Sequence, residues 1–94
     1  MKIRFTRPAD GDLTTLVDYI SSGSPHAAVE VLDRILTGIN RLADFPQLGH
    51  VGRLPDTLEL TVTRTPYIVV YRLMNDEVIV LRIRHGAMRW PPEL

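Results

Sequence analysis

The sequence contains no cysteine and only three histidines in 94 residues. The absence of cysteine excludes disulfides, thiolate zinc sites, iron–sulfur clusters and a cysteine nucleophile. The histidines, His26, His50 and His85, stand far apart, and no two have the short spacing that is typical of a metal site. We therefore expect neither a metal nor another cofactor.

Long apolar runs are also missing. No stretch approaches the ~18–20 residues that a membrane helix needs, and residues 1–5 enter an alternating pattern directly, without the apolar core of a signal peptide. A length of 94 residues and a hydrophobic share of 45% fit one globular domain over residues 1–94. We expect a soluble, cytoplasmic protein with no membrane contact.

Charge is balanced overall but unevenly placed. With 11 basic and 11 acidic residues the net charge is zero, which disfavours a generally basic nucleic-acid binder. All the basic residues except Lys2 are arginines, whose planar, bidentate donors suit carboxylates and phosphates. Residues 78–92 hold three arginines and no acid, so the C-terminal end predicts a local electropositive patch.

The spacing of apolar residues predicts two helices between strands. Ser24 and Pro25 are typical N-cap and first helical residues, and so short a link predicts an antiparallel helical hairpin. Further along, alternating and β-branched segments joined by short turns predict a meander of antiparallel strands. The expected elements are a strand over residues 1–6, helices over 8–22 and 25–44, a loop over 46–55, and strands over 58–64, 67–74 and 77–85.

This order of elements predicts a single-domain α+β fold. The helical hairpin would pack on one face of a twisted antiparallel sheet. The opposite face would be less protected, and a functional surface often lies on such a face or at the ends of the strands.

Alternation along the last strand divides its side chains between the two faces of the sheet. Those expected under the helices are Ile79, Leu81 and Ile83, and those expected on the opposite face are Val78, Val80, Arg82 and Arg84. Two arginines on one face need carboxylate partners, for which Glu59, Asp76 and Glu77 are candidates, or an external anion. The strand therefore predicts either internal ion pairs or a patch that binds phosphate or carboxylate.

Several aromatic side chains have two possible roles. His85 ends the last strand, where it either bonds the backbone or acts as a general acid and base on a ribose or phosphate. Trp90 either packs the C-terminal segment onto the domain or stacks on a base or a partner. Tyr67 and Tyr71 share one face of their strand, and we expect them half-buried with their hydroxyls at the rim.

The second helix carries a broad apolar stripe from Ala28 to Ala43, which includes Val31, Ile35 and Ile39. Most of this stripe must be core. It is wider than one small sheet covers, so the excess predicts an apolar groove for a partner helix or strand.

Eight short segments stand in a fixed order over nearly the whole chain. They are Phe5-Thr6, Asp12-Leu13, Tyr19-Ile20, Ser24-Pro25-His26-Ala27-Ala28, Phe45-Pro46-Gln47-Leu48-Gly49, Gly52-Arg53, Thr65-Pro66-Tyr67-Ile68-Val69-Val70-Tyr71-Arg72 and Arg82-Ile83-Arg84-His85-Gly86-Ala87-Met88-Arg89-Trp90-Pro91. Together they resemble the RelE/ParE superfamily of type II toxins. The resemblance implies a small α+β domain with a helical hairpin against an antiparallel sheet, in agreement with the order of elements.

The resemblance also implies one of two activities. RelE-like members cut mRNA on the ribosome with basic residues and no metal, whereas ParE-like members inhibit DNA gyrase. This sequence looks closer to ParE, because it lacks both the lysines of many RelE-like sites and the C-terminal tyrosine of some nucleases. The residues that could match a nuclease site are Arg64 and Arg82, on the scissile phosphate, and His85, which would move a proton.

We therefore expect a gyrase-inhibiting toxin that is not an enzyme, with plasmid stabilisation as its implied role. The alternative is a ribosome-dependent mRNA endoribonuclease, and a third hypothesis is a degenerate, non-toxic relative. Each activity implies a cognate antitoxin, ParD-like or similar, bound across the helical hairpin and the sheet edge by apolar anchors and arginine–carboxylate pairs. The candidate contacts to antitoxin or target are Arg53, Arg72, Arg82, Arg84, Arg89, Trp90, Val31, Ile35 and Ile39.

Overall fold

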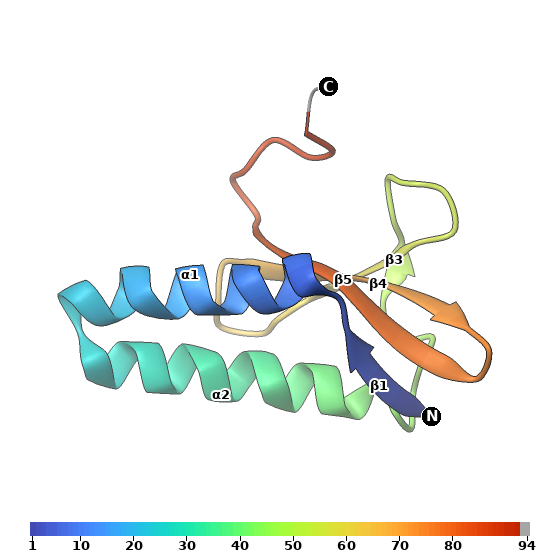
Figure 1. The fold of residues 1–94 in the computed structure, drawn as a ribbon, viewed down its shortest axis with the longest axis horizontal. Helices are drawn as coiled ribbons and strands as arrows, with labels where there is room; N and C mark the ends of the chain where they lie inside the picture. The colour runs from blue at the N-terminus through green and yellow to red at the C-terminus, as the bar shows by residue number, and fades with distance from the viewer. Residues whose placement is uncertain (93–94) are drawn as a thin grey trace.

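The computed structural model describes residues 1–92 as two helices packed on a five-stranded sheet (Figure 1). The elements are β1 (Lys2–Phe5), α1 (Arg7–Gly23), α2 (Pro25–Arg41), β2 (His50–Val51), β3 (Leu58–Thr61), β4 (Tyr67–Met74) and β5 (Glu77–His85). The α+β class and the antiparallel helical hairpin are confirmed. The turn between the two helices extends beyond the sheet (Figure 1). Within residues 1–92, no helix has both the length and the apolar character needed to cross a membrane.

Both helices begin directly after a capping residue. The side chain of Thr6 accepts the N–H of the third following residue, and Ser24 does the same for α2. The second helix ends at Arg41 rather than at residue 44. Proline at position 46 disfavours helical backbone in the residue before it, Phe45, so the chain leaves the helix in a turn.

The sheet is mixed rather than antiparallel. Its strand order is β1-β5-β4-β3-β2, and β1 runs parallel to β5 while the other pairs are antiparallel. A parallel pair needs a long crossover, and the helical hairpin with the strands after it supplies one between β1 and β5. The loop predicted over residues 46–55 contains the additional short strand β2. This strand gives no sequence pattern because it has two residues and Val51 is 84% exposed.

The predicted turn between β4 and β5 is confirmed. Asn75 and Asp76 have φ values of 53° and 60°. Two consecutive residues in the left-handed region are typical of a type I′ turn, whose twist matches that of an antiparallel hairpin.

A bulge in β5 reverses the predicted alternation of its side chains. The register of β4 and β5 shifts between Val70 and Tyr71, which leaves Leu81 as an extra residue. Beyond the bulge, Ile83 faces the helices as predicted. Before it the prediction was wrong: Ile79 is outside the core beneath the helices, and the residues inside that core are Val78 and Val80.

The core fills the space between the hairpin and one face of the sheet. Its fully buried members include Ile35, Ile39, Leu42, Val69, Tyr71, Val78 and Val80. The predicted half-burial of Tyr67 and Tyr71 was wrong, because both side chains are buried. The Tyr71 hydroxyl accepts the N–H of Gly49 at 2.9 Å and donates to the carbonyl oxygen of Pro46 at 2.8 Å. This tyrosine therefore holds the loop before β2 against the core.

Candidate functional site

Arg82 is engaged inside the protein by Asp12 of α1. Its Nε and Nη2 donate to the two carboxylate oxygens at 2.8 Å each, and these bonds raise the pKa of Arg82. Asp12 also accepts the N–H of Ile83 at 2.9 Å, where β5 extends past the end of β1. An internal ion pair is thus confirmed for Arg82, but with a carboxylate other than the three acids considered from the sequence.

Arg84 lies on the outer face of the sheet, beneath the C-terminal segment. Its Nη2 donates to Oε1 of Glu59 at 2.9 Å, and the two side chains are 5% and 4% exposed. Trp90 covers this pair, with the guanidinium carbon of Arg84 5.4 Å from the centroid of its ring. Arg53 closes the cluster, because its N–H donates to Glu59 Oε2 at 3.0 Å and its Nη1 to the Trp90 carbonyl oxygen at 2.8 Å. The outer face is therefore covered here, and Trp90 packs the C-terminal segment onto the domain.

The carboxylate of Glu59 is held ionised by this cluster. Burial raises the pKa of Glu59, but the hydrogen bonds from Arg53 and Arg84, together with the charges of Arg84 and His50, outweigh burial, so the pKa lies below the ordinary value of 4.5. The positive charge of Arg84 is consequently neutralised internally. Arg72 lies half-buried on the same face, and its Nε has no hydrogen-bond partner among residues 1–92.

His85 and Arg64 lie at the same end of the sheet. His85 pairs with Tyr67 across the strands, and their rings meet edge-on with centroids 5.5 Å apart. Arg64 occupies the exposed turn before Tyr67, with a φ of 63°. Nδ1 of His85 accepts the N–H of Ala87 at 3.0 Å, which assigns the proton of the neutral ring to Nε2. The backbone-bonding role of His85 is confirmed. The fold therefore brings Arg64 and His85 to one end of the sheet but leaves His85 and Arg82 occupied by other groups.

The predicted contact residues of the second helix are mostly core. Ile35 and Ile39 are 0% and 1% exposed, and Val31 packs against the core partly buried. The predicted contact residue Arg89 is not on this helix; it lies in the segment after β5 and is exposed. In the folded chain, therefore, the stripe on α2 faces inward, whereas a neighbouring, polar side of this helix, with Asp33, Arg34 and Thr37, lies beside β3.

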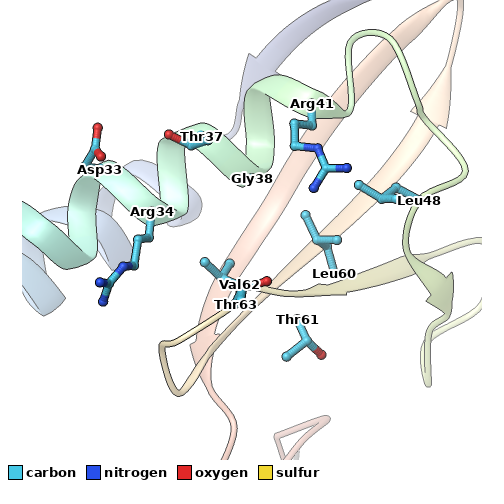
Figure 2. Close-up of a pocket in the computed structure, with 10 residues that line it drawn as sticks. All are labelled: Asp33, Arg34, Thr37, Gly38, Arg41, Leu48, Leu60, Thr61, Val62 and Thr63. Atoms are coloured by element: carbon cyan, nitrogen blue, oxygen red, sulfur yellow. The ribbon is translucent and has the colours of Figure 1, made fainter.

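A groove of about 480 Å³ lies between that side of α2 and β3 (Figure 2). Leu60, Val62 and Gly38 line its centre, and Leu48 of the loop before β2 lines one end. A Cβ added at Gly38 would come no closer than 3.6 Å to Leu60, which is an ordinary van der Waals contact. The groove therefore has room for a side chain at this position. We call this feature the α2–β3 groove. None of the apolar stripe lines it, since its α2 wall is the polar side of the helix, so it is not the groove predicted from the width of the stripe.

Two arginines of α2 place positive charge along the groove. Figure 2 shows Arg41 reaching toward Leu48 and Leu60, while Arg34 lies farther along the helix and Asp33 points away from β3. Arg34 donates to the carbonyl oxygen of Arg64 at 3.5 Å, at the limit of a hydrogen bond. Among residues 1–92, neither Arg34 nor Arg41 forms an ion pair. Neither arginine was predicted as a site residue, because both lie on the polar side of the helix.

A second cavity, of about 440 Å³, opens between α1 and the ends of β4 and β5. Tyr19 and Met88 form exposed parts of its wall, and Tyr67 and His85 complete it. Burial raises the pKa of Tyr67, with a further contribution from Tyr19. Asp12 is the acidic residue that lines this cavity, and it is paired with Arg82. The cavity therefore presents mainly aromatic and apolar surface.

The arrangement of two helices on a five-stranded sheet recurs among solved structures. A solved structure described as the chromosomal ParDE toxin–antitoxin system of P. aeruginosa matches with a TM-score of 0.80 and 26% identity, over 90% of this chain and 95% of that one. Residues 3–90 match the family model described as the ParE toxin of type II toxin–antitoxin system, parDE. The chain therefore belongs to the ParE toxin family.

Two relatives extend the comparison. A Sinorhizobium fredii protein provisionally named toxin Y4kP is 38% identical over 93 residues, which cover 99% of this chain and 96% of that protein. Toxin RelE2 of Caulobacter vibrioides is 35% identical over 86 residues, which cover 92% and 96%. Relatives therefore carry both ParE and RelE names, and the chain is a toxin of the type II toxin–antitoxin class within the ParE/RelE superfamily.

Proposed function

We propose that this toxin inhibits DNA gyrase by binding it, and that it acts in the cytoplasm until a cognate antitoxin neutralises it. The observation that carries the proposal is the internal use of two of the three residues that RNA cleavage would need, Arg82 and His85. Cleavage without a metal requires a cation free to stabilise the phosphate and a base free to accept a proton. Asp12 neutralises Arg82, and Nδ1 of His85 already accepts a backbone N–H.

Membership of the ParE toxin family supports the proposal of gyrase inhibition. Because other relatives are named RelE, the alternative activity to be tested is ribosome-dependent mRNA cleavage. The similar solved structures described as ParDE and RelBE systems support an antitoxin as the partner. The toxin would therefore be purified from a complex with its antitoxin before its target is assayed.

The direct test compares two assays on the purified toxin. We expect it to block supercoiling of relaxed plasmid by gyrase and to leave mRNA intact on translating ribosomes. Ribosome-dependent cleavage of mRNA, with supercoiling unaffected, would contradict the proposal and assign the toxin to the RelE-like class.

The variant His85→Ala sharpens this test in growing cells. We expect it to retain growth inhibition, because gyrase binding needs no proton transfer, whereas removal of a general base lowers a rate by about 10²- to 10⁴-fold. His26→Ala is the matched control, since that side chain is 87% exposed. Loss of toxicity only in the His85→Ala variant, with an unchanged melting temperature, would favour the nuclease.

A further inference from the structure

The cavity between α1 and the ends of β4 and β5 is lined by a buried hydroxyl that the fold does not use. Tyr67 is only 7% exposed and lines this cavity. Its backbone N–H bonds to Thr65, but its hydroxyl has no hydrogen-bond partner within residues 1–92. Buried polar groups in proteins are nearly always paired, so the Tyr67 hydroxyl is available to an external group.

Three further side chains of the lining offer hydrogen bonds in the same way. The N–H of Ala87 occupies Nδ1 of His85, which leaves Nε2–H of the neutral ring as a donor. The hydroxyls of Thr15 and Tyr19, on α1, also have no hydrogen-bond partner within residues 1–92. Groups from α1, β4 and β5 that the fold leaves unused therefore line one cavity.

The rest of the lining is mainly apolar. Leu16 and Ile83 are 6% and 4% exposed, whereas Tyr19 and Met88 stand at the opening with 78% and 52% of their surface exposed. A phenol ring and a thioether both make favourable contacts with an aromatic ring. The volume, about 440 Å³, and the combination of apolar surface with a few polar groups are typical of small-molecule sites.

The charge of the lining restricts the ligand. Within residues 1–92, no lysine or arginine lines the cavity. Its carboxylate, that of Asp12, already accepts hydrogen bonds from Arg82 and from the N–H of Ile83. A charged ligand would lose its hydration without gaining a counter-charge, so the cavity favours a ligand with no net charge.

We propose that this cavity binds a neutral nucleoside. The planar base would lie against Leu16 and Ile83 with the Tyr19 ring over it, and its ring nitrogens and exocyclic groups, together with the ribose hydroxyls, would bond to Tyr67 and His85. A hydrocarbon ring would leave these polar groups unpaired. A nucleoside supplies both a flat ring and polar atoms along several edges, and it carries no charge. The inference does not depend on the target of the toxin.

The same lining distinguishes a nucleoside from a nucleotide. A phosphate monoester carries a charge of about −1.5 to −2 at pH 7. In this cavity it would lie near the carboxylate of Asp12 and meet no cation of the lining. We therefore expect adenosine monophosphate to bind no more tightly than adenosine.

The test titrates the purified, folded toxin with adenosine and with uridine, followed by nuclear magnetic resonance. For at least one of them we expect saturable binding with a Kd below about 1 mM. The amide signals of residues 15–19 and 83–88 should shift, and those of residues 34–41, beside the α2–β3 groove, should not. No shift with either nucleoside up to about 10 mM would overturn the inference.

Two further ligands test the class of the occupant. Adenosine monophosphate that binds at least about tenfold more tightly than adenosine would show a phosphate site and overturn the proposal. A single-stranded oligonucleotide of ten thymidines should also bind no more tightly than the nucleosides. An affinity at least about tenfold higher for the strand, with shifts at the same amides, would assign the cavity to a nucleic acid instead.

Variants with matched controls place the ligand in the cavity. Tyr67→Phe removes only the unused hydroxyl, so it should weaken binding at least about fivefold without lowering the melting temperature. Tyr71→Phe removes a buried hydroxyl outside the cavity and should bind normally. Tyr19→Ala should also weaken binding at least about fivefold, whereas Phe45→Ala, at a residue that is 60% exposed elsewhere, should not.

These variants can also refute the inference. Unchanged affinity in either cavity variant would overturn the placement of the ligand. A lowered melting temperature of Tyr67→Phe would show that the hydroxyl is used inside the protein and would contradict the first step of the inference. Neither result depends on whether the toxin inhibits gyrase or cleaves mRNA.

Discussion

Replacing Glu59 with glutamine tests whether the buried cluster on the outer face stabilises the fold. The variant removes the negative charge opposite Arg84, whose side chain is only 5% exposed. Breaking a buried ion pair by removing one partner lowers stability by about 3–5 kcal/mol, because the remaining charge is buried without compensation. Glutamine retains one acceptor oxygen for Arg53 or Arg84, so we expect the lower end, about 3 kcal/mol.

For a domain of 94 residues, each kcal/mol corresponds to about 4–8 °C in melting temperature, so Glu59→Gln should lower it by about 12–24 °C. Urea unfolding at pH 7, followed by the fluorescence of the single tryptophan, Trp90, measures the free energy of unfolding directly. Glu30→Gln is the control, because Glu30 is 52% exposed and its loss should change stability by less than about 0.5 kcal/mol. A loss below about 1 kcal/mol for Glu59→Gln would refute the reasoning.

The same variant predicts a change in acid sensitivity. The pKa of Glu59 is lowered in the folded chain, so the carboxylate contributes stability that is fully present above its unfolded value of about 4.5. This contribution is lost as the pH falls below that value and through the lowered folded-state pKa. The difference in stability between the natural chain and Glu59→Gln should therefore shrink over this acidic range, and a constant difference would contradict the assignment.

Substitutions at three further positions have defined outcomes in urea unfolding. Tyr71→Phe should lower the free energy of unfolding by about 1–3 kcal/mol, because two partly buried backbone groups, of Pro46 and Gly49, lose their partner; a loss below about 0.5 kcal/mol would contradict this. Asp12→Asn should lower the free energy of unfolding by less than about 1 kcal/mol, because the ion pair with Arg82 is partly exposed and the amide oxygen can still accept the N–H of Ile83. Asp12→Ala removes that acceptor as well, so it should lower the free energy of unfolding by more. Gly38→Ala should raise stability by up to about 1 kcal/mol, and a decrease would show that its Cβ does not fit beside the groove.

The local parts of the fold were predictable because their causes are local. Ser24 with Pro25 begins α2, and the left-handed pair Asn75 and Asp76 joins β4 to β5. The parallel pairing of β1 depends instead on tertiary packing across the crossover. The bulge at Leu81 is also invisible in the alternation, since Val78 and Ile79 are both apolar and fit either face.

The candidate site was predictable only in part, because its ion pairs join residues that are far apart in the sequence. Sequence patterning found the arginines of the last strand but could not assign their partners, because Asp12 is 70 residues from Arg82 and Glu59 is 25 residues from Arg84. The α2–β3 groove was not predicted, because none of the apolar stripe lines it. Its arginines lie on the polar side of the helix, where charged residues are ordinarily solvated and nothing local marks their position opposite β3.

These assignments change how loss of toxicity in arginine variants is to be interpreted. Removing Arg84 leaves Glu59 buried without its main counter-charge and lowers the stability of the fold, so loss of activity in such a variant does not show that Arg84 contacts a target. Removing Arg41 breaks no ion pair within residues 1–92, so its effect reports on an external partner. An arginine therefore identifies a binding surface in this toxin only when its variant keeps the melting temperature of the natural chain, and the arginines of α2 meet that condition better than those of β5.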